Sequence, residues 1–189
     1  MVRFTSEELA SFRDATVADL LGEQPPRLLF VGINPGLWTA ATQTHFAHPS
    51  NRFYPALFRA GITERELDRV AGLSDADRGH LVDRGVAITN IVARATARAS
   101  ELSTAELRAG ADQLKERLEV WRPRVVAVAG VTAYRTAFKR PKATLGRQET
   151  TLAGAQLWIV PNPSGLNAHE TVDTLAERYR EVAEAAGVV

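Results

Sequence analysis

The sequence predicts an α/β fold in which a central, mostly parallel sheet is covered by helices on both faces, in three layers α/β/α. Short continuous apolar runs, each ended by Gly, Pro or polar residues, alternate with stretches of helical periodicity. Such runs are typical of parallel strands that are buried on both faces. The 189 residues can enclose a full core, and we expect one domain over residues 1–189.

The expected elements follow in chain order. Thr5 and Glu8 fit a capping box, and apolar residues at roughly helical spacing then predict a first helix that ends at Gly22. Strands are expected at residues 27–33, 85–89, 124–130 and 156–161, and helices in the stretches that begin at residues 51, 75, 103, 131 and 170. In such a sheet, ligands bind at the carboxyl ends of the strands. The loops that follow the first and the last strand are therefore the candidate site.

Composition excludes some kinds of chemistry. The chain has no cysteine, so neither disulfides nor thiolate metal sites nor iron–sulfur clusters are possible. No apolar run approaches the length of a membrane span, and the N-terminal stretch lacks the apolar core of a signal peptide. We expect a cytoplasmic protein with no membrane partner.

The net charge is only +1, but the acidic residues are unevenly placed. Residues 24–63, 84–100 and 120–148 contain no Asp or Glu and carry several Arg and Lys. If the fold brings these segments together, they form a positive face suited to nucleic acid. The alternative, that the arginines are scattered over a solvated surface, is equally compatible with the sequence.

The stretch GINPG, residues 32–36, ends the first expected strand. Gly32 and Gly36 allow close backbone approach, Pro35 fixes φ, and Asn34 presents an amide from a stiff turn. The stretch matches neither the phosphate-binding nor the dinucleotide-binding glycine pattern. The remaining alternative is a tight turn without further function.

Four further residues of the two loops could have either a structural or a binding role. His45 and His48 have no nearby carboxylate or thiol, so we expect turn or capping roles and no metal site. Phe46 between them is either a core residue or an aromatic face for a planar ligand. Leu166, in the loop PNPSGLNAH, is either tucked inward or held out as a wedge.

The motifs GINPG, FAHPSNRFY, TNIVARAT and NPSGL, in this order, resemble those of the Mug-type mismatch-specific uracil-DNA glycosylases, relatives of thymine-DNA glycosylase. The resemblance spans essentially the whole chain. It implies the uracil-DNA glycosylase fold and a monofunctional enzyme without metal or cofactor. It also implies excision of uracil and related damaged bases from double-stranded DNA, particularly opposite guanine. We expect a monomer that is associated with the nucleoid if the source is a bacterium.

The resemblance also implies roles for individual residues. Asn34 matches the asparagine that holds the attacking water, and Phe46 matches the aromatic on which the flipped base stacks. Gly32, Ile33 and Asn90 match positions of the base pocket. Gly165, Leu166 and Asn167 match the loop that fills the vacated stack and contacts the widowed guanine. Extruding a base costs least for a mismatched pair, so this loop would favour G·U sites.

Ala93 departs from the family pattern, in which Asp or Glu precedes the corresponding Arg. Alanine supplies neither base nor charge, so the activity of this chain is expected to be impaired, through natural loss or an inactivating replacement. A protein that binds G·U mismatches or lesions without excision is therefore one alternative. An unrelated small-molecule enzyme on the same kind of sheet is another. Candidate phosphate contacts are Arg52, Arg94, Arg98 and the cluster from Lys139 to Arg147.

Overall fold

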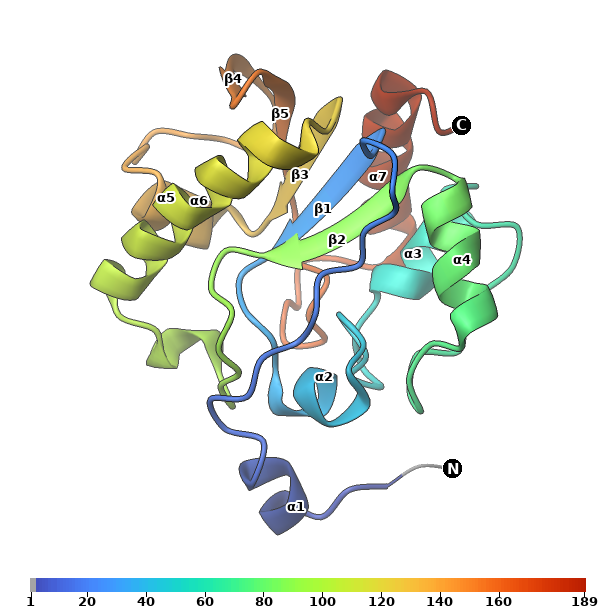
Figure 1. The fold of residues 1–189 in the computed structure, drawn as a ribbon, viewed down its shortest axis with the longest axis vertical. Helices are drawn as coiled ribbons and strands as arrows, with labels where there is room; N and C mark the ends of the chain where they lie inside the picture. Colours follow the sequence, from blue (N-terminus) through green and yellow to red (C-terminus); the bar gives the residue numbers. More distant parts are fainter. Residues whose placement is uncertain (1–2) are drawn as a thin grey trace.

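The computed structural model describes residues 3–189 and contains a five-stranded sheet (Figure 1). Its strands are β1 (Leu28–Gly32), β2 (Val86–Asn90), β3 (Val125–Ala129), β4 (Gly146–Leu152) and β5 (Ala155–Val160), in the order β2-β1-β3-β5-β4. Strand β4 pairs antiparallel with β5, and all other pairings are parallel. The predicted α/β class and the mostly parallel sheet are confirmed.

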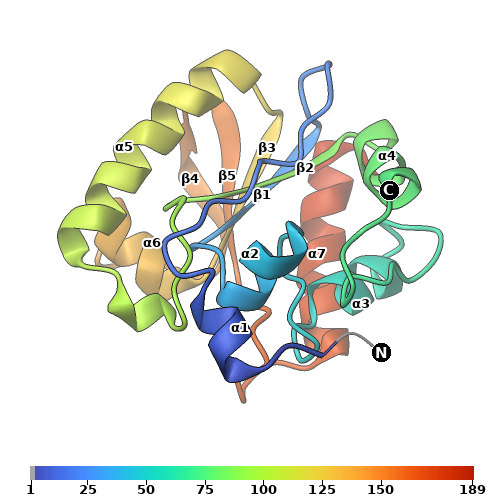
Figure 2. The same cartoon turned by 60° about the horizontal axis from the view of Figure 1, so that its bottom comes forward.

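Helices cover both faces of the sheet, as Figure 2 shows. One face carries α3 (Phe53–Arg59), α4 (Asp75–Asp83) and α7 (Val172–Ala186), and the other carries α5 (Thr104–Trp121) and α6 (Val131–Ala137). Leu28 and Phe30 of β1 belong to the core under the first group of helices, whereas Leu29 and Val31 belong to the core under the second. Since both faces of β1 are buried, the strand needs an unbroken apolar run. Among residues 3–189, no helix has the length and apolar character that crossing a membrane requires.

Three elements lie outside the predicted set, and one of them is the single 3-10 turn η1 (Ala99–Glu101). Strand β4 is an edge strand with the polar sequence GRQETTL, so its residues carry no apolar pattern that distinguishes them from a loop. Helix α2 (Leu37–Thr42) is a short helix in what the sequence predicts as a loop, and it begins at the extended Gly36. Strand β4 pairs only with β5, to which a tight turn at Ala153 and Gly154, both with positive φ, joins it.

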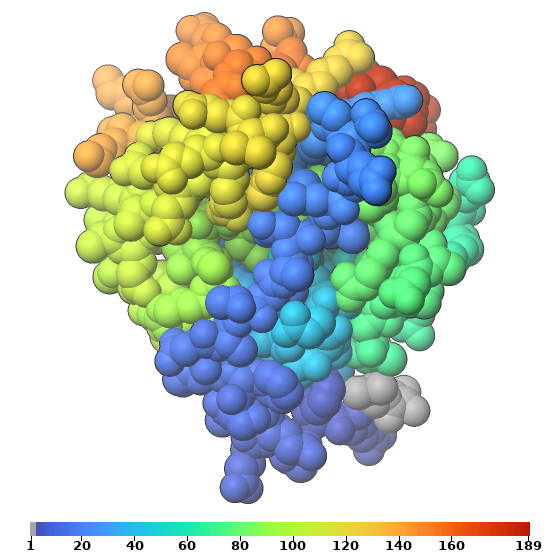
Figure 3. Space-filling model, in the orientation of Figure 1, coloured from blue at the N-terminus to red at the C-terminus, as the bar shows by residue number. Residues whose placement is uncertain are grey.

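The first helix is much shorter than the sequence predicts. The capping box at Thr5 and Glu8 is present, but α1 comprises only Ser6–Ala10. The chain turns at Asp14, whose φ is 64° and whose backbone N–H donates to the Ala95 carbonyl. The segment then runs along β2, where Leu20 exchanges both backbone hydrogen bonds with Ile88. Figure 3 shows this N-terminal segment lying across the outer face of the molecule.

The sheet register brings the candidate loops together. Gly32 at the end of β1 is the register partner of Asn90 at the end of β2. Strand β5 runs parallel to these strands, so the loop that begins at Pro161 leaves the same edge of the sheet. Helices α1 and α2 pack together beside that edge (Figures 1 and 2). The chain segments that follow β1, β2 and β5 therefore meet at one end of the molecule, together with α1.

Gly110 allows α5 to lie against the chain just after β2. A Cβ at this position would be 2.4 Å from the Ile91 carbonyl oxygen. Alanine is more favourable than glycine inside a helix by about 1 kcal/mol. At position 110, however, its Cβ would collide with the backbone of Ile91, which cannot rotate away as a side chain can. We therefore expect Gly110→Ala to lower the free energy of unfolding by about 1–3 kcal/mol, measured by urea denaturation.

Gly79 in α4 provides the matched control, because a Cβ there would meet no atom within 4 Å. Gly79→Ala is expected to raise the free energy of unfolding by about 0.5–1 kcal/mol. If both substitutions stabilise the protein, the close approach of α5 does not constrain Gly110.

Candidate active site

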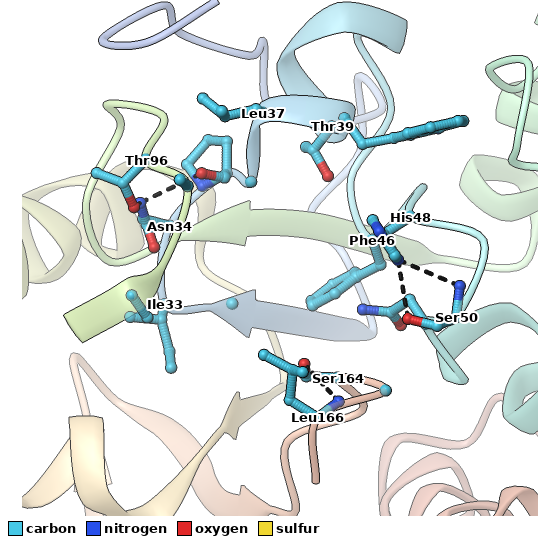
Figure 4. A pocket seen from close by; sticks show the side chains of 18 of the residues that line it. Ile33, Asn34, Leu37, Thr39, Phe46, His48, Ser50, Thr96, Ser164 and Leu166 are labelled. Atoms are coloured by element: carbon cyan, nitrogen blue, oxygen red, sulfur yellow. Dashed lines mark hydrogen bonds between the residues drawn. The ribbon is translucent and has the colours of Figure 1, made fainter. Parts of the chain in front are cut away.

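A cavity of about 640 Å³ lies at the carboxyl end of the sheet. This size is ordinary for a small-molecule or nucleobase site. Most of the residues that the sequence assigned to the site line it: Gly32, Ile33, Asn34, Phe46, Asn90, Gly165 and Leu166. Asn167 and Ala93 do not line it. Figure 4 shows Asn34 and Thr96 on one side of the cavity and Phe46 and His48 on the other.

The side-chain amide of Asn34 is fixed by three acceptors. Its Nδ2 donates to the Pro35 carbonyl (3.2 Å), the Arg94 carbonyl (3.0 Å) and Thr96 Oγ1 (2.8 Å). Thr96 donates its own hydroxyl hydrogen to the Arg98 carbonyl, so Thr96 Oγ1 must accept from Asn34. The Asn34 Oδ1 receives no hydrogen bond from the described residues and is left as an acceptor at the cavity wall.

Thr96 is a site residue that the sequence did not reveal. It is 1% exposed and lines the cavity beside Asn34. A threonine 62 positions after Asn34 gives no local signal of this contact. Only the parallel pairing of β1 with β2, continued by the backbone bond from Thr96 to Pro35, brings the two residues together.

Phe46 has an aromatic face available for a planar ligand. Its ring stacks on Phe53 at a centroid distance of 4.2 Å and an interplanar angle of 26°. Phe53 is fully buried, whereas Phe46 is only partly buried and lines the cavity. Its backbone is in the left-handed region, with φ at 56°. Phe46 thus joins the core on one side and faces the cavity on the other.

Of the two histidines, one has the predicted role and one does not. The backbone N–H of Ser50 donates to His48 Nδ1 (3.2 Å), which is a turn contact of the expected kind. His45, in contrast, is 3% exposed, and its two ring nitrogens contact Asn90 Nδ2 and the Ala18 carbonyl. The turn or capping role predicted for His45 is wrong, because the side chain is buried under the cavity.

The loop after β5 holds Leu166 out from the surface. Leu166 is 90% exposed, the largest exposure of any large hydrophobic residue within residues 3–189. The guanidinium of Arg52 braces the loop by donating to the carbonyls of Ser164 (3.2 Å) and Asn167 (3.0 Å). Gly165 packs tightly on Ser50, since a Cβ on Gly165 would be 2.3 Å from Ser50 Oγ. The loop is therefore anchored at its base while its apolar tip is free.

Two of the expected phosphate contacts are engaged within the protein. Arg52 braces the loop around Leu166, and Arg94 pairs with Glu106 (2.6 Å) and Asp14 (2.8 Å). The hydrogen bonds to these carboxylates raise the pKa of Arg94, and the bond from Arg94 lowers the pKa of Glu106 to about 2. Arg52 and Arg94 thus have partners within the protein, and their contact with phosphate stays a prediction. Lys139, Arg140, Lys142 and Arg147 are exposed, as is Arg98.

The cavity wall carries few ionisable groups. Among the described residues that line it, only Arg13 and His48 are ionisable, and none is Asp or Glu. Burial lowers the pKa of His48, which favours the neutral ring at neutral pH. Ala93 is exposed to solvent and lies outside the wall. Residues 3–189 contain no group of three or more His, Asp or Glu side chains placed to hold a metal ion.

Helix α1 contributes part of the wall. Ser6, Leu9 and Ala10 of α1 line the cavity, as does Arg13 just after the helix. The Phe4 ring packs edge-on against Trp38 of α2 at a centroid distance of 4.9 Å. The sequence predicted a helix here but no role at the site. The family model described as the Uracil DNA glycosylase superfamily matches residues 20–185 of the chain, so the α1 wall precedes the matched region.

Proposed function

Because this chain belongs to the uracil-DNA glycosylase superfamily, we propose that it excises uracil from double-stranded DNA, especially opposite guanine, and leaves an abasic site. Membership implies a DNA glycosylase, which hydrolyses the bond between a base and deoxyribose. The observation that carries the proposal is the fixed amide of Asn34, which faces the aromatic ring of Phe46 across the cavity.

The proposed reaction begins with extrusion of the damaged nucleotide. Leu166 enters the space that the base leaves, and the flipped base stacks on Phe46. A mismatched base costs the least to unstack, so a G·U pair is favoured over a stable pair. Asn90 and the backbone of Gly32 and Ile33 bound the pocket around the base.

The chemical step needs little from ionisable side chains. Asn34 Oδ1 accepts a hydrogen bond from a water and directs its oxygen at the sugar carbon, while the base departs with the electron pair of the glycosidic bond. The sugar passes through an oxocarbenium-like state that a positioned water captures. Asn34 cannot deprotonate this water, so its contribution is to place the water. The proton that the water loses on attack passes through solvent to the departing base anion, which leaves as the neutral base.

A second function, binding of G·U mismatches or lesions without excision, is favoured by the absence of carboxylates from the described cavity wall. The two functions are separated by single-turnover incubation with G·U, A·U, G·T and single-stranded uracil substrates, followed by alkaline cleavage of abasic sites. Gel-shift binding of the same duplexes is measured in parallel. Cleavage of the G·U strand supports excision, whereas tight G·U binding with no abasic product from any substrate supports the binder.

Restoring the expected acid at position 93 tests whether its loss impairs this chain. Ala93 is exposed and does not line the cavity, so a carboxylate there is not placed beside the water proposed at Asn34. We expect Ala93→Asp to change the single-turnover rate by less than about threefold, which is under 1 kcal/mol of barrier. A tenfold or greater increase would show that the missing carboxylate belongs to the mechanism, as the family pattern suggests.

A further inference from the structure

Residues 94–96, which follow β2, supply two of the three acceptors that hold the Asn34 amide. Asn34 Nδ2 donates to the Arg94 carbonyl (3.0 Å) and to Thr96 Oγ1 (2.8 Å), the second of which is drawn in Figure 4. This acceptor segment belongs to no helix or strand. Its Thr96 N–H donates to the Pro35 carbonyl (3.1 Å), which joins one side of the segment to the chain around Asn34. The place of the two acceptors therefore depends on what holds the other side.

The other side of the acceptor segment is held by residues 13–20, which we call the N-terminal strap. The Asp14 N–H donates to the Ala95 carbonyl (2.9 Å), and the Ala95 N–H donates to the Ala15 carbonyl (2.8 Å). Ala95 is fully buried and lies between the two residues that hold Asn34. The strap thus fixes the middle of the acceptor segment through two backbone hydrogen bonds.

The side chain of Arg94 makes a second link between the segment and the strap. Its guanidinium donates to Asp14 Oδ1 of the strap (2.8 Å) and to Glu106 Oε1 of α5 (2.6 Å). Arg13, next to Asp14, forms an ion pair with Glu101 just beyond the segment. The residue whose carbonyl accepts from Asn34 is therefore held through its side chain as well as through its neighbour in the chain.

The strap is itself fixed to the body of the molecule. Besides its pairing with β2, two of its backbone carbonyls accept hydrogen bonds from side chains that follow α2: Thr16 from Gln43 (3.1 Å) and Ala18 from His45 (2.9 Å). Residues 13–19 of the strap precede residues 20–185, which the family model matches. Almost all of this support for the acceptor segment therefore comes from outside the matched region.

We propose that the N-terminal strap is a positioning element of the active site, which keeps the Arg94 carbonyl and Thr96 Oγ1 where they hold the Asn34 amide. Asp14 and Arg94 do not line the cavity, so they are positioning residues that act through Asn34. When the strap is released, the acceptor segment is free to shift. Misplacing a group that orients a reactant by about 1 Å costs on the order of 100-fold in rate.

Proline at position 14 separates the strap from the segment. Its ring fixes φ at about −65° and it has no N–H, so Asp14→Pro loses both the turn at φ 64° and the bond to the Ala95 carbonyl. Asp14→Asn is the conservative variant, because asparagine also adopts the left-handed region and its Oδ1 still accepts from Arg94. Asp75→Pro is the matched control, since Asp75 is the first residue of α4, where proline is favoured, and lies outside the cavity wall.

This inference rests on the proposed excision of uracil, so its test joins a rate and an affinity to a direct observation of Asn34. Single-turnover excision from a G·U duplex gives the rate. The dissociation constant is measured with 2′-fluoro-deoxyuridine opposite guanine, a nucleotide whose glycosidic bond resists cleavage. NMR of the free protein follows the side-chain amide of Asn34, whose signals are assigned by their loss in Asn34→Ala.

Asp14→Pro is expected to lower the excision rate by about tenfold to a hundredfold, while the dissociation constant changes by less than about threefold. The Nδ2 hydrogens of Asn34 should exchange with water faster than in the wild-type protein, because the amide is no longer fixed. Asp14→Asn and Asp75→Pro should keep the wild-type Asn34 signals and a rate within about threefold of wild type. In the Asn34→Ala background, Asp14→Pro should cause little further loss, since no amide remains to be positioned.

The inference is overturned if folded Asp14→Pro excises uracil at the wild-type rate or leaves the Asn34 amide signals and their exchange unchanged. Should Asp14→Pro give no cooperative thermal transition, Arg94→Leu decides instead, because it removes both ion pairs and keeps the carbonyl. Unchanged Asn34 signals in that variant also refute the proposal. If the wild-type protein forms no abasic site, the NMR comparison still tests the strap, so the failure of excision and the failure of this inference are distinguishable.

Discussion

Replacement of Asn34 by alanine is expected to lower the single-turnover rate of uracil excision on the order of 100-fold to 1,000-fold. The amide of Asn34 is held by the Arg94 carbonyl and Thr96 Oγ1, and its free Oδ1 is the only group that we propose to orient the attacking water. Alanine removes this acceptor without adding bulk. Affinity for G·U duplex should change little, because Asn34 contacts the water rather than the flipped base.

Thr96→Val provides a graded comparison for Asn34→Ala. Valine keeps the volume of Thr96 but removes the hydroxyl that accepts from Asn34 Nδ2. The amide keeps its contact with the Arg94 carbonyl, so we expect a loss of roughly tenfold, smaller than that of the alanine variant. The rates are compared in rapid-quench experiments, with thermal melting as the check on folding. A fully active Asn34→Ala enzyme would remove Asn34 from the mechanism.

Replacement of Leu166 by alanine is expected to weaken G·U duplex binding and excision by about tenfold to a hundredfold. Burial of a leucine side chain in the vacated base stack contributes about 1.5–3 kcal/mol, which corresponds to that range. Leu166 is 90% exposed in the free protein, so little internal packing is lost on substitution. Arg52 and the close fit of Gly165 on Ser50 keep the base of the loop in place.

The substrate series separates this role of Leu166 from a general loss of affinity. The effect of Leu166→Ala should be largest for A·U, intermediate for G·U and smallest for uracil opposite an abasic-site analogue, where no pair is broken. Val120→Ala is the control, because Val120 is also a large exposed apolar residue, at 78%, and lies on α5 away from the cavity. An equal loss on all three substrates would contradict a wedge.

The sequence predicts the elements that bury apolar side chains and fails where contacts are long-range. Strands β1, β2, β3 and β5 are apolar on both faces, so their runs are visible in the sequence. Strand β4 is a polar edge strand and gives no such signal. The spacing of apolar residues after Leu9 suggests a long helix, but Leu20 pairs with Ile88 instead of continuing one.

The candidate site shows the same division. The resemblance to a known family identifies Asn34, Phe46 and Leu166 as site residues, because each of them lies in a short motif of adjacent residues. The residues that orient these side chains or their neighbours come from elsewhere in the chain. Thr96 lies 62 positions from Asn34, His45 lies 45 positions from Asn90, and Arg52 lies 112 positions from Ser164. The local sequence around Arg52 does not show that this side chain donates hydrogen bonds to the loop that carries Leu166.

The position of α1 has a practical consequence for handling the protein. The chain enters the fold beside the cavity, with Phe4 against Trp38 and the helix on the cavity wall, whereas the C-terminus lies at the opposite end of the molecule (Figure 1). An affinity tag or fluorophore fused ahead of Phe4 therefore emerges next to the surface that would receive DNA. The same label placed after Val189 is remote from that surface, so assays of binding or excision are better served by C-terminal attachment.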